Sequence, residues 1–115
     1  KLSKNVGVFS EEAPTLIFNR LKNAQDGLME WIKIRETSTK EILDELFKRN
    51  IQSVLVEGGS RTLQYFIIDN VWDEARVIVG NKKFNEGMRA PVLTKTPIKS
   101  HPFGPEDTLY YYHRK

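Results

Sequence analysis

Residues 57 to 60, Glu-Gly-Gly-Ser, place a carboxylate, two flexible residues and a hydroxyl directly after the apolar run Val54-Leu55-Val56. A carboxylate in this position must be exposed or held by hydrogen-bond donors, because an unpaired buried charge is costly. Glu57 can accept hydrogen bonds from a ligand's sugar hydroxyl or amine, or it can cap nearby backbone N–H groups. Gly58 and Gly59 allow an anion close to the backbone, and the start of a helix attracts phosphate. The stretch therefore predicts a phosphate-binding turn or, alternatively, a plain strand-to-helix turn, because Gly-Gly alone matches no nucleotide-binding motif.

The elements around this turn indicate where such a site would lie. The uninterrupted apolar stretch 53–57 predicts a buried strand of a parallel sheet. Ser60 can cap a following helix that ends near Asp69-Asn70, and residues 74–80 predict another strand. The inward stripe of this helix would be Leu63, Phe66 and Ile67. Strand, helix and strand make a βαβ unit, and open α/β sheets usually bind ligands at the carboxyl ends of their strands.

The remaining elements give a fold class. Residues 15–18 and 31–36 predict strands, because Ile32 and Ile34 alternate with charged residues in the second of them. Ser38 and Glu41 form a capping-box pattern, which predicts a helix that stops at Asn50. The apolar face of this helix would be Ile42, Leu43, Leu46 and Phe47. We predict an α/β fold with a mixed sheet that contains the βαβ unit.

The C-terminal residues, 97–115, predict two antiparallel strands joined by a turn at Gly104-Pro105. Tyr110 and Tyr112 would face one side of the sheet and Tyr111 the other, because side chains alternate along a strand. His101 and His113 lie in or beside these strands without cysteines to join them, so we predict no metal site.

Composition limits the classes of protein. The 115 residues, with a mass of 13.4 kDa, suit one domain, and no apolar run approaches the roughly 20 residues of a membrane-spanning helix. The absence of cysteine fits a reducing cytoplasm. The net charge of +3 comes from scattered basic residues, which argues against nucleic acid as a partner. Lys82, Lys83 and Arg89, in the loop 80–91, are either phosphate contacts or solvated surface residues.

The stretch SVLVEGGSRTLQYFIIDNVWDEARVIVG resembles the core of the reductase domain of riboflavin biosynthesis. That domain is usually the C-terminal half of a bifunctional deaminase-reductase and has a dihydrofolate-reductase-like fold. The resemblance extends upstream through APTLIFN and downstream through RAPVL to the final strands. The most specific part is V-E-G-G-S followed by a helix and VWDEARV.

The resemblance implies an NADPH-dependent enzyme that reduces 5-amino-6-(5-phosphoribosylamino)uracil to its ribitylamino counterpart. Gly58, Gly59 and Ser60 would bind along the phosphates of NADPH. Glu57 would lie near the nicotinamide or the sugar of the substrate, as the candidate catalytic residue.

The chain departs from the family in one respect, because reductase domains are considerably longer. We expect residues 1–115 to be the C-terminal portion of such a domain, a partial dihydrofolate-reductase-like fold that lacks catalytic activity alone. An uncovered sheet edge or apolar face would then favour a homo-oligomer. Two other functions stay open: another dihydrofolate-reductase-like NADPH reductase, and a non-catalytic dimerisation module.

Overall fold

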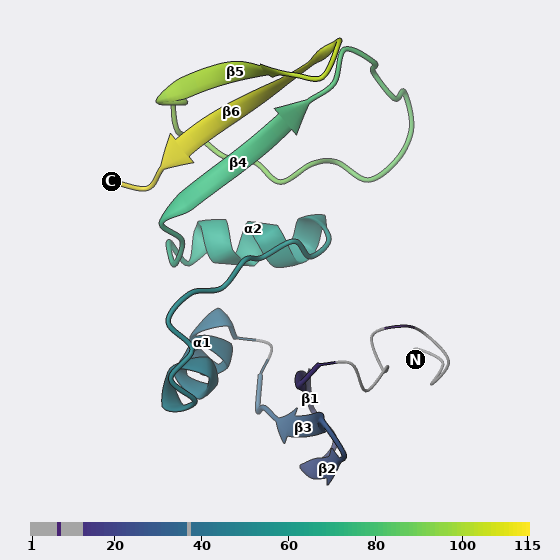
Figure 1. The fold of residues 1–115 in the computed structure, drawn as a ribbon, viewed down its shortest axis with the longest axis vertical. Helices are drawn as coiled ribbons and strands as arrows, with labels where there is room; N and C mark the ends of the chain where they lie inside the picture. The colour runs from purple at the N-terminus through teal and green to yellow at the C-terminus, as the bar shows by residue number, and fades with distance from the viewer. Residues whose placement is uncertain (1–6, 8–12, 37) are drawn as a thin grey trace. The chain divides into compact units, whose positions relative to one another are not determined.

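The structure, a computed structural model, describes residue 7, residues 13–36 and residues 38–115. It divides into two compact units, residues 1–53 and residues 54–115. Among the described residues, the first unit contains three strands and one helix, and the second contains one helix and three strands (Figure 1). Each unit has its own three-stranded sheet. The mixed α/β class predicted from the sequence is therefore confirmed.

The sheet of the first unit is mixed. Its strands are β1 (Thr15–Asn19), β2 (Ala24–Asp26) and β3 (Met29–Lys33), in the order β1-β3-β2. β3 pairs parallel with β1 and antiparallel with β2. The strands predicted at 15–18 and 31–36 correspond to β1 and β3, whereas no strand was predicted at the position of β2. Gly27 adopts a φ of 57° between β2 and β3, a conformation that glycine reaches without strain.

Asn19 organises the turn that leaves β1. Its side-chain oxygen accepts hydrogen bonds from the backbone N–H groups of Leu21 and Lys22, each at 2.9 Å. Its side-chain nitrogen donates to the carbonyl of Lys22, also at 2.9 Å. An asparagine can replace missing backbone partners in this way, so the chain reverses tightly before it enters β2. Neighbouring β3 carries Ile32, which is buried as the alternating pattern predicts, as is Ile34 just after it.

Helix α1 (Thr39–Lys48) begins and ends where the sequence predicts. The side chain of the N-cap residue, Ser38, accepts a hydrogen bond from the Glu41 N–H. The Glu41 carboxylate turns to the preceding backbone and accepts from the N–H of Arg35 at 3.0 Å. Asn50 has a φ of 58° and stops the helix. Of the predicted apolar face, Phe47 is 81% exposed, whereas Ile42, Leu43 and Leu46 are half-buried.

The segment 51–59 has no regular secondary structure, so the strand predicted at 53–57 is not formed. The predicted βαβ unit is accordingly absent from the described residues. Leu55 is 82% exposed and Val54 is 46% exposed. An aliphatic run becomes a strand only when a neighbouring strand accepts its backbone hydrogen bonds, because strand preference depends on context. No such pairing is formed by this run in the described part of the chain.

Helix α2 (Ser60–Ile68) lies in the second unit. Its N-cap is Gly59, so Ser60 is the first helical residue and not the predicted cap. The predicted inward stripe is confirmed as half-buried: Leu63, Phe66 and Ile67. The predicted end is also confirmed, because Asp69 is the C-cap and Asn70 takes a φ of 55°.

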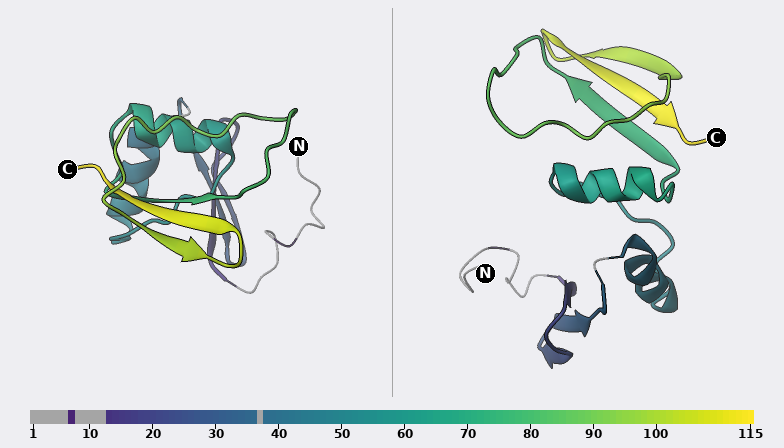
Figure 2. Two further views of the ribbon diagram at one scale, coloured as in Figure 1. Left: turned by 90° about the horizontal axis from the view of Figure 1, so that it is seen from above. Right: turned by 180° about the vertical axis from the view of Figure 1, so that it is seen from behind.

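The sheet of the second unit is antiparallel, in the order β4-β6-β5 (Figure 2). Its strands are β4 (Glu74–Val79), β5 (Lys99–Phe103) and β6 (Asp107–His113). β5 and β6 form the predicted hairpin, with Gly104 at a φ of 71° in the turn. Tyr111 stands opposite Arg76 on β4 and Lys99 on β5, and both cations lie over its ring. The predicted alternation of the three tyrosines is therefore confirmed.

A long connection, residues 80–98, joins β4 to β5 and passes the N-terminal end of α2 (Figures 1 and 2). It exposes several apolar side chains, among them Phe84 at 90% and Met88 at 85%. Long loops without secondary structure are uncommon in compact domains and are often functional.

No helix among the described residues is long and apolar enough to cross a membrane.

Candidate functional site

The two glycines before α2 differ in the space around them. A Cβ atom on Gly58 would lie 3.1 Å from Cβ of Thr62, one turn into the helix. A Cβ atom on Gly59 would meet nothing within 4 Å. A side chain on Gly58 would therefore require Thr62 to shift by a few tenths of an ångström, whereas the space beside Gly59 is open. Gly59 is exposed, so a ligand can approach the backbone at the start of α2 from this side.

The first turn of α2 can receive an anion. Gly59 provides no side-chain cap, and the first turn contains no acidic residue. The early backbone N–H groups of a helix have no intrahelical partner, and the helix dipole makes this end positive. Arg61, which is exposed, adds a positive charge to the same turn. These features fit a phosphate group.

Glu57 is exposed. Among the described residues, none is seen to hydrogen-bond or ion-pair with its carboxylate. The alternative in which Glu57 caps nearby N–H groups is therefore not what the structure shows. The carboxylate precedes Gly59 by two residues, and no described protein group competes with a ligand for its hydrogen bonds.

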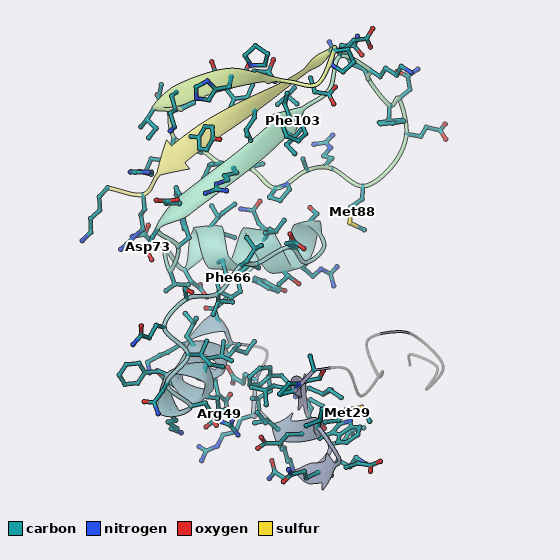
Figure 3. The ribbon with its side chains drawn as sticks, in the orientation of Figure 1. Met29, Arg49, Phe66, Asp73, Met88 and Phe103 are labelled. Atoms are coloured by element: carbon teal, nitrogen blue, oxygen red, sulfur yellow. The ribbon has the colours of Figure 1, made fainter. Side chains whose placement is uncertain are left out.

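Ser60 makes a contact that the sequence did not predict. Its hydroxyl donates a hydrogen bond of 2.6 Å to the backbone carbonyl of Arg89 in the 80–98 connection. The hydroxyl of Ser60 therefore donates its proton to a protein group. Its backbone N–H, in the first turn of the helix, has no intrahelical partner and can still donate to a ligand. Met88, the residue before Arg89, lies beside this end of α2 (Figure 3).

Gln64 holds the same connection one turn further along α2. Its side-chain oxygen accepts from the Val92 N–H at 2.7 Å, and its side-chain nitrogen approaches the Val92 carbonyl at 3.4 Å. Sequence reasoning did not single out Gln64. The signal that marks it is its spacing, because residues four apart share one face of a helix and Ser60 lies four residues earlier.

Of the three basic residues considered in this loop, only Arg89 is brought to the start of α2 by a described contact, through its backbone. Lys82 and Lys83 are exposed, as is the side chain of Arg89. Glu57, Gly58, Gly59 and Ser60 are consecutive in the sequence, and the structure brings the backbone of Arg89 to Ser60 and that of Val92 to Gln64.

A second polar cluster belongs to the first unit and links β3 to α1. Arg49 bridges Glu30 at 2.6 Å and Glu45 at 2.7 Å, and Lys48 pairs with Glu45 at 2.7 Å. Hydrogen bonds from Lys48 and then Arg49 hold the pKa of Glu45 below its ordinary value, and the Glu45 contact raises the pKa of Lys48. The carboxylates of Glu30 and then Glu45 raise the pKa of Arg49. Glu30, Glu45 and Arg49 line an open hollow of about 580 Å³. Their charges neutralise one another, so the cluster is primarily a brace between strand and helix.

The histidines are not gathered with other metal ligands. His101 stands edge-on to the Tyr111 ring, with 5.7 Å between ring centroids, and His113 lies 3.6 Å from Glu74. Across the part of the chain that the structure describes, no three His, Cys, Asp or Glu side chains are grouped as a metal would require.

Residues 1–96 match the family described as the RibD C-terminal domain. The chain belongs to this family. The resemblance to the riboflavin-biosynthesis reductase domain, stated from the VEGGS turn and the VWDEARV stretch, is thereby confirmed.

Relatives of this RibD C-terminal domain chain agree in sequence and in fold. It is 29% identical over 84 residues to the riboflavin biosynthesis protein RibD of Aquifex aeolicus (strain VF5). It also superimposes, with a TM-score of 0.73 and 26% identity, on a crystal structure from Thermotoga maritima. That structure is of a diaminohydroxyphosphoribosylaminopyrimidine deaminase/5-amino-6-(5-phosphoribosylamino)uracil reductase.

The RibD C-terminal domain chain is much shorter than these two relatives. The match to the Aquifex aeolicus protein covers 69% of this chain but 24% of the relative, and the structural match covers 92% of this chain and 32% of the other.

Proposed function

We propose that this chain is part of an NADPH-dependent reductase of riboflavin biosynthesis, acting on 5-amino-6-(5-phosphoribosylamino)uracil. Membership in the RibD C-terminal domain family supports the pathway, and the Thermotoga maritima protein supports the substrate. The observation on which the proposal depends most is the uncapped start of α2 after Gly59, an open turn that suits an anionic ligand.

The residues present fit the phosphates of NADPH at this turn. The open space at Gly59 allows close approach, and the N–H groups of Ser60 and the residues after it would donate to phosphate oxygens. Arg61 would add charge. Gly58 would serve indirectly, because its lack of a side chain lets the turn pack against Thr62.

Glu57 would orient the sugar of the substrate or the nicotinamide. NADPH, when bound, supplies the hydride, so the protein chiefly aligns donor and acceptor. An exposed carboxylate without a protein partner can accept hydrogen bonds from ribose hydroxyls without losing a structural contact. Its contribution would be positional and electrostatic.

The proposal further holds that residues 1–115 form the C-terminal portion of the reductase domain and do not complete the site. The match to 32% of a deaminase-reductase supports this. The test compares NADPH oxidation by the 115-residue chain with that of a reductase domain extended at its N-terminus, with the pyrimidine as substrate. We expect turnover only from the extended protein. Comparable turnover from the chain alone would show that its own residues complete the site.

Substrate choice separates the proposal from its closest alternative. Another dihydrofolate-reductase-like enzyme would oxidise NADPH with dihydrofolate or a different heterocycle, and not with the phosphoribosylamino-pyrimidine. A dimerisation module would bind no NADPH at all. We place the reaction in the cytoplasm, and we expect a small-molecule substrate rather than nucleic acid or a membrane, consistent with the scattered charge and the absence of cysteine.

A further inference from the structure

Two side chains of α2 hold the same short piece of the 80–98 connection. Ser60 donates to the carbonyl of Arg89, and Gln64 pairs with the backbone of Val92 through both of its side-chain groups. The two helical residues are four apart, so they lie one above the other on one face of α2. Their backbone partners are three apart, so the held segment runs along that face.

These contacts are the described hydrogen bonds that tie residues 89–92 to α2. The segment itself is poor in other restraints, because Arg89 and Val92 are exposed, Val92 by 64%. It also contains Pro91, which cannot donate a backbone hydrogen bond. An exposed segment held by few contacts opens readily when one of them is lost.

We propose that Ser60 and Gln64 form a clamp, a pair of positioning residues that fixes residues 89–92 beside the first turns of α2. The hydroxyl of Ser60 then serves the loop, whereas the resemblance to the family had assigned Ser60 to the cofactor. The clamp thereby fixes the position of residues 89–92 at one side of the proposed ligand site. Its role in NADPH binding rests on the proposed function, but its existence does not.

The first experiment measures limited cleavage of the 115-residue chain by trypsin. Arg89 is a cleavage site within the clamped segment, and Lys83 is a site in the same loop but outside the clamp. Gln64→Met keeps side-chain size and helix propensity but removes both hydrogen bonds. We expect cleavage after Arg89 to accelerate about fivefold, as for the loss of an ordinary hydrogen bond, while cleavage after Lys83 is unchanged.

Two variants serve as controls. Gln64→Glu keeps an acceptor for the Val92 N–H, the shorter of the two contacts, and should restore part of the protection. Gln52→Met makes the same exchange at an exposed glutamine outside the clamp and should change nothing. In the double variant Ser60→Ala/Gln64→Met, the increase in the rate of cleavage after Arg89 should be smaller than the product of the two single increases. Both contacts hold the same segment, so their effects are not independent.

The second experiment uses the extended reductase and steady-state kinetics. If the clamp positions the loop for the cofactor, Gln64→Met should raise the KM for NADPH about fivefold with kcat little changed, since binding in the ground state and in the transition state is weakened equally. Unchanged cleavage after Arg89 would overturn the clamp. Faster cleavage with an unaltered KM would overturn its role in binding. A wild-type enzyme that oxidises no NADPH would sink the proposed function, while the cleavage result still decides the clamp.

Discussion

Gly58 and Gly59 are adjacent, but a Cβ atom would lie close to Thr62 at Gly58 and in open space at Gly59. Gly59→Val would fill the open space beside the helix start, so we expect NADPH affinity of the extended reductase to fall about tenfold, or about 1.4 kcal/mol, with little change in melting temperature. Gly58→Ala would press on Thr62 and should lower the melting temperature by about 4 °C. Fluorescence titration and thermal unfolding measure the two effects. Undiminished NADPH binding by a folded Gly59→Val protein would reject the phosphate role.

Glu57 provides the second prediction at the scale of a residue. Glu57→Gln keeps the shape of the side chain and removes its charge, so turnover of the extended reductase should fall by about ten- to a hundredfold. Stability should change by less than about 0.5 kcal/mol, because the carboxylate is exposed and has no described partner. Steady-state kinetics and thermal unfolding on the same preparations test this. Normal turnover with a lower melting temperature would indicate a structural residue.

At the scale of elements, the ion pairs that join β3 to α1 should make the free energy of unfolding depend on pH. The pKa of Glu45 in the folded state lies below its ordinary value of 4.5, so its ion pairs stabilise the fold above that value and are lost as pH falls through the lowered pKa. We expect the melting temperature of the wild type to exceed that of Glu45→Gln near pH 6 and the difference to shrink and vanish as the pH falls below the lowered pKa of Glu45. A difference that is constant across this range would show that the ion pairs do not stabilise the fold. Asp44→Asn, which alters the exposed pair with Lys40, is the matched control.

The sequence predicts those elements best whose boundaries are set by residues close to one another in the chain. The Ser38 cap and the Asn50 stop define α1 from side-chain and backbone chemistry within a few residues, and the turn at Gly104 defines the last hairpin. The prediction of a strand at 53–57 was wrong for this chain, because pairing requires a partner that no local pattern reveals. β2 was missed for the converse reason, since Ala24, Gln25 and Asp26 form a strand only because β3 is beside them.

At the scale of the whole molecule, exposed apolar surface should drive self-association. Leu55, Phe47 and Ile68 are each more than half exposed, and among the described strands β4 pairs with β6 alone. Open edges and apolar surface are commonly covered by another chain. We expect light scattering of the 115-residue chain to show dimers or larger species at micromolar concentration. Leu55→Lys should shift the sample toward monomer, and Leu21→Lys, at another exposed leucine, provides a comparison.

The sequence by itself determined the family, both ends of α1 and the end of α2, because each depends on residue types at short fixed spacings. The VEGGS turn and the VWDEARV stretch were enough to predict a riboflavin reductase domain, which the family match to residues 1–96 confirms. Only the tertiary structure decided which glycine has open space, that the Ser60 hydroxyl binds Arg89, and that Gln64 holds Val92. These contacts join residues nearly 30 positions apart, and no local rule of spacing specifies which backbone group meets a given side chain across such a distance.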